Sequence, residues 1–106
     1  MTFAFPKPKR IRRVPKQSKR NAFSKATRTK ILERDDGFCQ ECGRPARNIH
    51  HCMPRSRGGR GVVTNGIVVC PICHDLIHRN HALLEKWQII MEDRYGSDYY
   101  KDVYDE

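Results

Sequence analysis

The chain has 106 residues, of which 21 are Lys or Arg and 12 are Asp or Glu, so its formal charge is +9. This length allows one domain and excludes Rossmann-type and barrel enzymes, which need roughly twice as many residues. Hydrophobic residues make up only 38% of the chain, so we expect a small core that needs a staple such as a metal ion or a disulfide. The chain has no run of about 18 apolar residues, so we expect no membrane span. It also has no apolar stretch near the N-terminus that would predict a secretory signal.

The positive charge is concentrated at the N-terminus. Residues 1–30 contain eleven basic residues and no acidic one, whereas residues 31–106 are close to neutral. Prolines and the lack of a sustained apolar period predict a flexible, basic arm over residues 1–23. Such an arm is typical of a protein that contacts nucleic-acid phosphates, and its other interpretation is a solubilising or targeting tail. The expected phosphate contacts within it are Lys7, Lys9, Arg10, Arg12 and Arg13.

The elements that follow are short. Within a folded domain over 24–96 we expect, in chain order, a helix over 25–35, strands over 47–53 and 67–69, and helices over 71–80 and 81–94. Ser24 is the expected N-cap of the first helix, and Pro71 suits the first turn of the second. The segment 54–66 is rich in glycine and predicts a long loop. Gly96 stops the last helix, and we assign no structure to the acidic, tyrosine-rich tail over 97–106.

Four of the five cysteines form two Cys-x-x-Cys turns separated by 27 residues: Cys39 with Cys42, and Cys70 with Cys73. Each turn can place two sulfurs on one zinc ion, and two turns complete a tetrahedral site. Disulfides are the competing explanation, but an odd number of cysteines counts against a fully paired framework. We therefore predict a structural zinc whose binding, on the order of 10 kcal/mol, is folding free energy. Cys52 is expected to lie in the core as a small hydrophobe.

Four histidines lie between the cysteine pairs or just after them. His74 and His78 are four residues apart on an expected helix, so both can reach one ion that is distinct from the zinc. His50 and His51 are adjacent on an expected strand and point to opposite faces, so one can join the helical pair while the other does something else. The plainer interpretation, that these are ordinary surface or core histidines, fits four such positions poorly. His81 is interpreted as an ordinary residue at a helix start.

The order Cys-x-x-Cys, His-His, Gly-Gly, Asn, Cys-x-x-Cys-His-x-x-x-His resembles the HNH endonucleases over residues 39–78. The resemblance implies a ββα-metal core. Together with the zinc and the arm predicted above, we expect an α+β fold whose core is stapled by the four-cysteine zinc, with flanking helices and a basic disordered N-terminal arm. Small single-domain members of this family are common in bacteriophage genomes. The resemblance therefore implies a cytoplasmic protein of a bacterial or phage-infected cell, with DNA and other phage DNA-processing proteins as partners.

The resemblance also implies roles for individual residues. His51 would be the general base, and His50, His74 and His78 would hold the catalytic divalent ion. Asn65 would either orient His51 or pin the hairpin through hydrogen bonds. The ion is left open among Mg, Mn, Ni and Zn, although a shell rich in histidine favours the transition metals.

The residues themselves support the same chemistry. A neutral imidazole can take a proton from water at physiological pH, and an ion held by histidines keeps open positions for phosphate oxygens. Arg55, Arg57 and Arg60 in the glycine-rich loop are expected to contact DNA, unless the loop is only a flexible connector. We predict a metal-dependent endonuclease or nickase that hydrolyses DNA phosphodiester bonds. The alternative is a non-catalytic, zinc-stapled nucleic-acid-binding module. A thiol–disulfide oxidoreductase is excluded because no βαβ pattern surrounds either cysteine pair.

Overall fold

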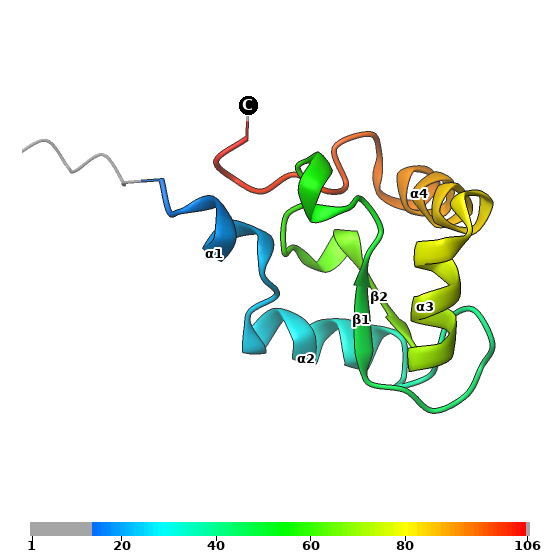
Figure 1. The fold of residues 1–106 in the computed structure, drawn as a ribbon. Helices are drawn as coiled ribbons and strands as arrows, with labels where there is room; N and C mark the ends of the chain where they lie inside the picture. Colours follow the sequence, from blue (N-terminus) through cyan, green and yellow to red (C-terminus); the bar gives the residue numbers. More distant parts are fainter. Residues whose placement is uncertain (1–13, 106) are drawn as a thin grey trace, which may run out of the picture.

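The computed structural model describes residues 14–105 and contains a two-stranded antiparallel sheet surrounded by helices (Figure 1). In chain order the elements are α1 (Gln17–Asn21), α2 (Lys25–Arg34), β1 (Asn48–His51), the 3-10 turns η1 (Arg55–Arg57) and η2 (Val63–Asn65), β2 (Gly66–Val69), α3 (Pro71–Arg79) and α4 (His81–Tyr95). The predicted α+β class is confirmed. No helix within residues 14–105 is long and apolar enough to cross a membrane.

The sheet separates two small cores. Ile49 of β1 and Val68 of β2, which are register partners, pack with Ile31 of α2. Ile67 and Val69, on either side of Val68 in β2, face the opposite way into a larger core formed with α3 and α4. All four residues of β2 are buried, which explains its unbroken run of β-branched residues. This alternation also determines which way the adjacent histidines of β1 point.

The expected helix signals are present. The Ser24 hydroxyl accepts a hydrogen bond from the Thr27 N–H at the start of α2. Pro71 occupies the first turn of α3, and Asn80 separates α3 from α4 while its side chain caps α4. α4 ends at Tyr95 and is followed by its C-cap, Gly96, which has a φ of 93°. The first strand is shorter than predicted, because only Asn48–His51 pair with β2.

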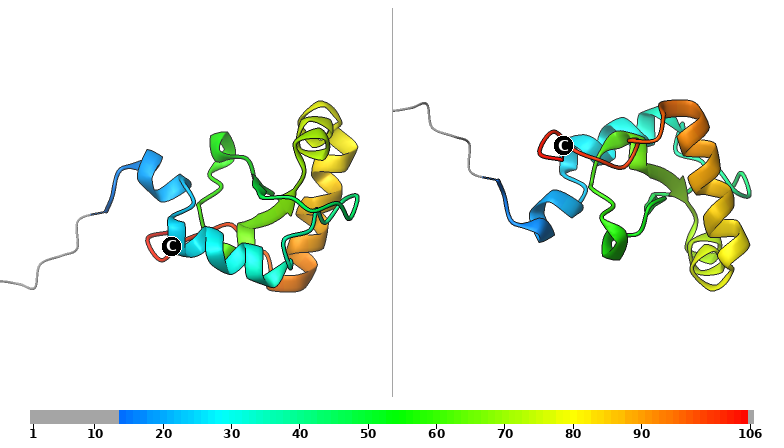
Figure 2. Two further views of the ribbon diagram at one scale, coloured as in Figure 1. Left: turned by 90° about the horizontal axis from the view of Figure 1, so that it is seen from below. Right: turned by 90° about the horizontal axis from the view of Figure 1, so that it is seen from above.

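The two ends of the described chain differ most from the prediction. We expected a flexible arm through residue 23, but Gln17–Asn21 form α1, and the described part of the tail returns to lie beside it (Figures 1 and 2). The Arg20 guanidinium donates hydrogen bonds to Asp102 at 2.9 and 2.8 Å and to Asp105 at 2.9 Å. Tyr99, in the tail to which we assigned no structure, is 4% exposed within the larger core. These long-range contacts explain why neither end could be assigned from local pattern.

Candidate metal centres and active site

The two Cys-x-x-Cys turns meet at one point. Cys39 and Cys42 lie on the turn between α2 and β1, and Cys70 and Cys73 lie at the start of α3. The four sulfur atoms all lie within 4.8 Å of one another. All of these thiols are free, and the Cys42 and Cys70 sulfurs are 3.6 Å apart, well beyond a disulfide bond length. The arrangement is that of a four-cysteine metal site, and the disulfide alternative does not form.

The electrostatics of this cluster also fit a cation. Burial alone would raise the pKa of the Cys39 thiol, but backbone hydrogen bonds from Cys70, Cys42 and Glu41 outweigh it and lower that pKa to about 7. A backbone hydrogen bond from Cys73 likewise lowers the pKa of Cys70. Burial raises the pKa of Cys73. Metal ligation requires thiolates, and the backbone of this chain already favours them at two of the four positions.

Cys52 stands apart from the four. Its side chain is completely buried in the larger core, and burial raises its pKa to about 12. It remains a neutral thiol at physiological pH and packs as a small hydrophobe, as predicted.

A second cluster joins β1 to α3. His50, His74 and His78 each offer a ring nitrogen, and these atoms lie within 4.8 Å of one another. The His50 ring centroid is 5.4 Å from that of His74 and 5.6 Å from that of His78. His50 is 1% exposed, and neither of its ring nitrogens has a hydrogen-bond partner among the described residues. Buried polar atoms without partners are uncommon, and a metal ion at this cluster would satisfy one of them.

The charge state of His50 suits metal ligation. Burial, followed by the neighbouring His74 and His78, lowers the pKa of His50 to about 3. The ring is therefore neutral at physiological pH and keeps a lone pair for an ion. Burial also lowers the pKa of His74.

His51 is not a member of this cluster and is held by the N-terminal segment. Its Nε2 atom lies 2.6 Å from the backbone oxygen of Asn21, and its ring stacks on Phe23 with centroids 4.1 Å apart. A carbonyl oxygen can only accept, so Nε2 carries the hydrogen and Nδ1 keeps a free lone pair. Burial lowers the pKa of His51, although the Asn21 carbonyl opposes that effect. The result is a neutral imidazole with a defined tautomer.

Sequence reasoning missed Asn21 and Phe23 as contacts of His51. Both lie 28 or more residues before it, in a segment expected to be flexible. The available signal was the stretch without proline between Pro15 and Ser24, which is long enough for a short helix.

Asn65 makes its side-chain hydrogen bonds with the backbone of the loop after β1. It is completely buried; its Oδ1 accepts from the Met53 N–H at 2.7 Å, and its Nδ2 donates to the backbone oxygens of Met53 at 3.2 Å and Arg60 at 3.0 Å. Among the hydrogen bonds of residues 14–105, none joins Asn65 to His51. Of the two roles we predicted for it, these contacts correspond to pinning the loop after β1.

A cavity of about 400 Å³ brings the two kinds of histidine together. His50, His51, His74 and His78 all line it, although His50 and His51 project from opposite faces of β1. Pro54, Arg55, Ser56, Ile49 and Leu84 complete the lining. The cavity thus combines a three-imidazole cluster, an oriented neutral imidazole and an arginine.

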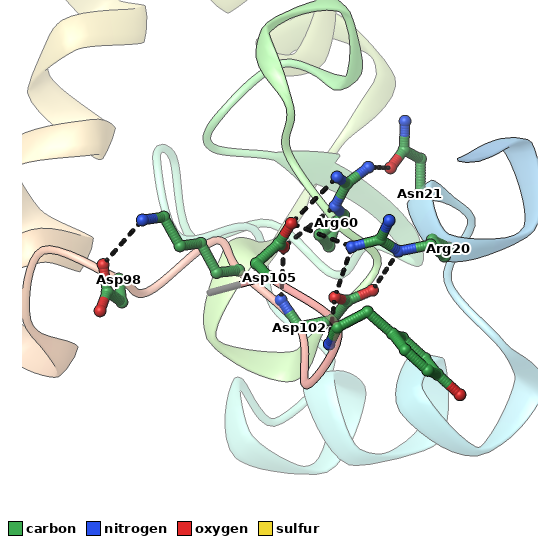
Figure 3. Close-up of polar contacts among 8 residues, drawn as sticks. Arg20, Asn21, Arg60, Asp98, Asp102 and Asp105 are labelled. Atoms are coloured by element: carbon green, nitrogen blue, oxygen red, sulfur yellow. Dashed lines mark hydrogen bonds and ion pairs between the residues drawn. The ribbon is translucent and has the colours of Figure 1, made fainter. Parts of the chain in front are cut away.

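The predicted arginine contacts separate into two groups. Arg55 and Arg57 are exposed on η1, and Arg55 lines the cavity. Arg60 differs from the prediction, because its side chain is only 12% exposed and donates to Asp105 and Asn21 (Figure 3). Its charge is already neutralised within the chain, so it is not available to DNA in this structure. The predicted contacts Lys7, Lys9, Arg10, Arg12 and Arg13 lie outside the described residues.

Comparison with known proteins finds a family that matches this part of the chain. Residues 39–80 match the family model described as HNH endonuclease. This segment is an HNH domain. The matched range begins at the first metal-site cysteine and includes both histidine groups and Asn65, so the resemblance stated from the sequence is confirmed.

Two proteins of Escherichia coli (strain K12) are similar to the chain. The type IV methyl-directed restriction enzyme EcoKMcrA is 32% identical over 82 residues, which cover 68% of this chain and 28% of that protein. The uncharacterized protein YdfU is 34% identical over 59 residues, which cover 56% of this chain and 16% of that protein. The chain therefore spans less than a third of the length of either relative.

Proposed function

We propose that this protein is a metal-dependent DNA endonuclease or nickase that hydrolyses phosphodiester bonds. The observation that carries the proposal is the cavity in which His51, neutral and oriented, lies beside the cluster of His50, His74 and His78. The HNH family match and the similarity to a restriction enzyme support DNA as the substrate.

We assign separate ions to the two clusters. A zinc ion on the four cysteines would have a structural role, because all four positions of a tetrahedral site are supplied by the protein. The three histidines would hold a divalent ion that supplies positive charge for a phosphate oxygen and the leaving oxygen. We leave this ion open among Mg, Mn, Ni and Zn, with the imidazole shell favouring a transition metal.

The protein's own groups would then divide the work. His51 Nδ1 accepts a proton from the attacking water, while the Asn21 carbonyl holds the Nε2–H and stabilises the positive charge that develops on the ring. Phe23 limits rotation of the ring by stacking on it. Arg55 lies at the cavity and can donate to a phosphate oxygen. Asn65 pins the loop that carries Arg55.

The alternative remains a non-catalytic nucleic-acid-binding module. Such a module needs the basic residues and the four-cysteine site, but DNA binding alone does not require the oriented, neutral His51 ring beside three further histidines. A cytoplasmic location and phage DNA-processing partners stay predictions from the sequence.

Cleavage of a supercoiled plasmid with a panel of divalent ions tests the proposal. We expect His51→Ala to keep its affinity for DNA and for metal but to cleave about 10²- to 10⁴-fold more slowly at saturating metal. His74→Ala should instead bind metal more weakly, and excess metal should partly restore its activity. His81→Ala is the matched control, because His81 is 67% exposed on α4 and its one ion-pair contact among residues 14–105 is with Glu85.

Single-turnover cleavage and calorimetric metal titration separate these outcomes. Normal cleavage by His51→Ala, together with an inactive His50→Ala that still binds the ion, would mean that the two adjacent histidines have exchanged roles. If the wild-type protein binds DNA but cleaves it with none of the ions, the binding-module function holds instead.

A further inference from the structure

Four charged residues tie together three segments that are far apart in the sequence (Figure 3). Arg20 of α1 donates to Asp102 and Asp105 of the C-terminal tail, and Arg60 of the loop after β1 donates to both oxygens of Asp105 at 3.1 Å. Their side chains are between 12 and 19% exposed. We call Arg20, Arg60, Asp102 and Asp105 the clasp. Ion pairs shielded to this degree are screened less by salt than pairs on the open surface.

The clasp ends on the residue that holds His51. Arg60 donates a further hydrogen bond to the Asn21 side-chain oxygen at 2.8 Å, and Arg20 immediately precedes Asn21 in α1. Asn21 is itself 5% exposed, and its backbone oxygen receives the His51 Nε2–H at 2.6 Å. A continuous chain of contacts therefore runs from the C-terminal aspartates, through both arginines, to the imidazole.

The backbone contacts around Asn21 are equally close. The Gly61 N–H donates to the Arg20 backbone oxygen at 2.8 Å, and a Cβ on Gly61 would lie 2.0 Å from the backbone oxygen of Ala22. α1 has only five residues, and a helix of that length is not stable by itself. The position of the Asn21 carbonyl therefore depends on the contacts that the clasp and Gly61 make with α1.

We propose that the clasp is a positioning device for His51, so that the C-terminal tail sets the tautomer and orientation of the imidazole without lying in the cavity. Asp102 and Asp105 are positioning residues that act through Arg20, Arg60 and Asn21. The consequence for cleavage rests on the proposed function, whereas the state of the His51 ring can be measured without DNA.

A purely structural role for the tail makes a different prediction. If the clasp only stabilised the fold, its loss would lower DNA binding and cleavage together. On the positioning account, neutralising the aspartates frees two arginines, so DNA affinity stays the same or increases while cleavage slows. DNA affinity and cleavage rate therefore do not fall together, because the freed guanidinium groups can contact phosphate while His51 loses its orientation.

The test compares two double variants of the metal-loaded protein. Asp102→Asn/Asp105→Asn removes the acidic half of the clasp, and Asp93→Asn/Asp98→Asn removes the same charge from exposed positions nearby. Nitrogen-15 spectra of the histidine rings, at one neutral pH and without DNA, report the tautomer, with His51→Ala identifying the His51 signals. We expect wild type and control to show the single Nε2–H form of His51 and the clasp variant to show a tautomer mixture.

Single-turnover cleavage and DNA-binding measurements complete the test. We expect about a tenfold to hundredfold slower cleavage by the clasp variant, with a dissociation constant no weaker than that of the control. Asp105→Glu, which keeps the charge, should recover part of the rate. A clasp variant whose His51 tautomer and cleavage rate match the control overturns the inference.

A second variant guards against a failure to fold. Gly61→Ala keeps every charge but forces the loop away from Ala22, so it should give the same tautomer mixture; an unchanged His51 signal in it also counts against the inference. If the wild-type protein cleaves no DNA, the tautomer measurement still decides the role of the clasp, and only the proposed function fails.

Discussion

Replacement of Asn65 by alanine distinguishes a structural from a catalytic role for this residue. Asn65 is completely buried, and its amide makes three hydrogen bonds to backbone groups of Met53 and Arg60. Alanine removes all three and leaves the Met53 N–H and two carbonyls without their partner. The loop after β1, which carries Arg55, would lose the side-chain hydrogen bonds that join Met53 and Arg60 at its two ends.

The expected cost follows from the contacts. Each hydrogen bond contributes about 1 kcal/mol net, so the variant should be about 3 kcal/mol less stable, and more where a buried group finds no water. For a domain of this size, that lowers the melting temperature by about 12 to 24 °C. Urea unfolding followed by circular dichroism, at one fixed zinc concentration, measures the loss in free energy of unfolding. Asn48→Ala is the control, because Asn48 is exposed at the start of β1.

Cleavage by the same variant completes the argument. At a temperature where Asn65→Ala is fully folded, we expect cleavage within about tenfold of wild type, because Asn65 makes no hydrogen bond to His51. A variant as stable as wild type that nevertheless loses 10²-fold or more in rate would refute this reasoning and favour the other expected role of Asn65, orienting His51.

Three further predictions address the metal site, the acidic tail and the arm. Cys39→Ser should prevent folding, because a site closed by four thiolates contributes folding energy, whereas Cys52→Ala should cost only about 1 kcal/mol; native mass spectrometry and urea unfolding measure the bound ion and the stability. Hydrogen bonds from Arg20 and Arg60 hold the pKa values of Asp102 and Asp105, respectively, below their usual range. A depressed carboxyl pKa stabilises the fold above the unfolded value of about 4 and loses that contribution as pH falls further. The stability difference between wild type and Asp102→Asn/Asp105→Asn should therefore shrink between pH 6 and pH 3, and a constant difference would contradict the ion pairs. Deleting residues 1–13 removes five positive charges and should flatten the slope of log DNA affinity against log salt by at most about 4.5 units, with the His51 tautomer unchanged. An unchanged slope would show that this segment makes no phosphate contact.

The sequence predicted the parts of the molecule whose signals are local. Spacing alone placed Cys39 with Cys42 and His74 with His78, because a short turn and one helical turn each have fixed geometry. Strand alternation correctly separated His50 from His51. The helix-start signals, Ser24 as an N-cap and Pro71 in a first turn, were equally local and were confirmed.

The parts that could not be predicted depend on contacts between distant segments. Arg20, in a basic segment with many neighbours of the same charge, gives no sign that it pairs with residues 82 and 85 positions later. Arg60 looks like Arg55 and Arg57 in the sequence, and only the fold places it against Asp105 instead of solvent. The net charge calculated from composition therefore counts Arg20 and Arg60 as available for DNA contact, although both are paired with aspartates in the fold.

The position of the family match suggests how the work is divided along this chain. Residues 39–80 contain the four-cysteine cluster, the three-histidine cluster and His51, whereas Asn21, Phe23 and the clasp aspartates lie outside that range. The cysteine cluster joins the turn before β1 to the start of α3, and the histidine cluster joins β1 to α3, so every member of both lies within residues 39–80. Orienting His51 needs a carbonyl from another segment, which the hairpin does not supply here. On the proposed function, a protein that shares residues 39–80 but has different flanking segments must hold its equivalent imidazole by other means, so metal binding and the rate of the chemical step would vary independently between such proteins.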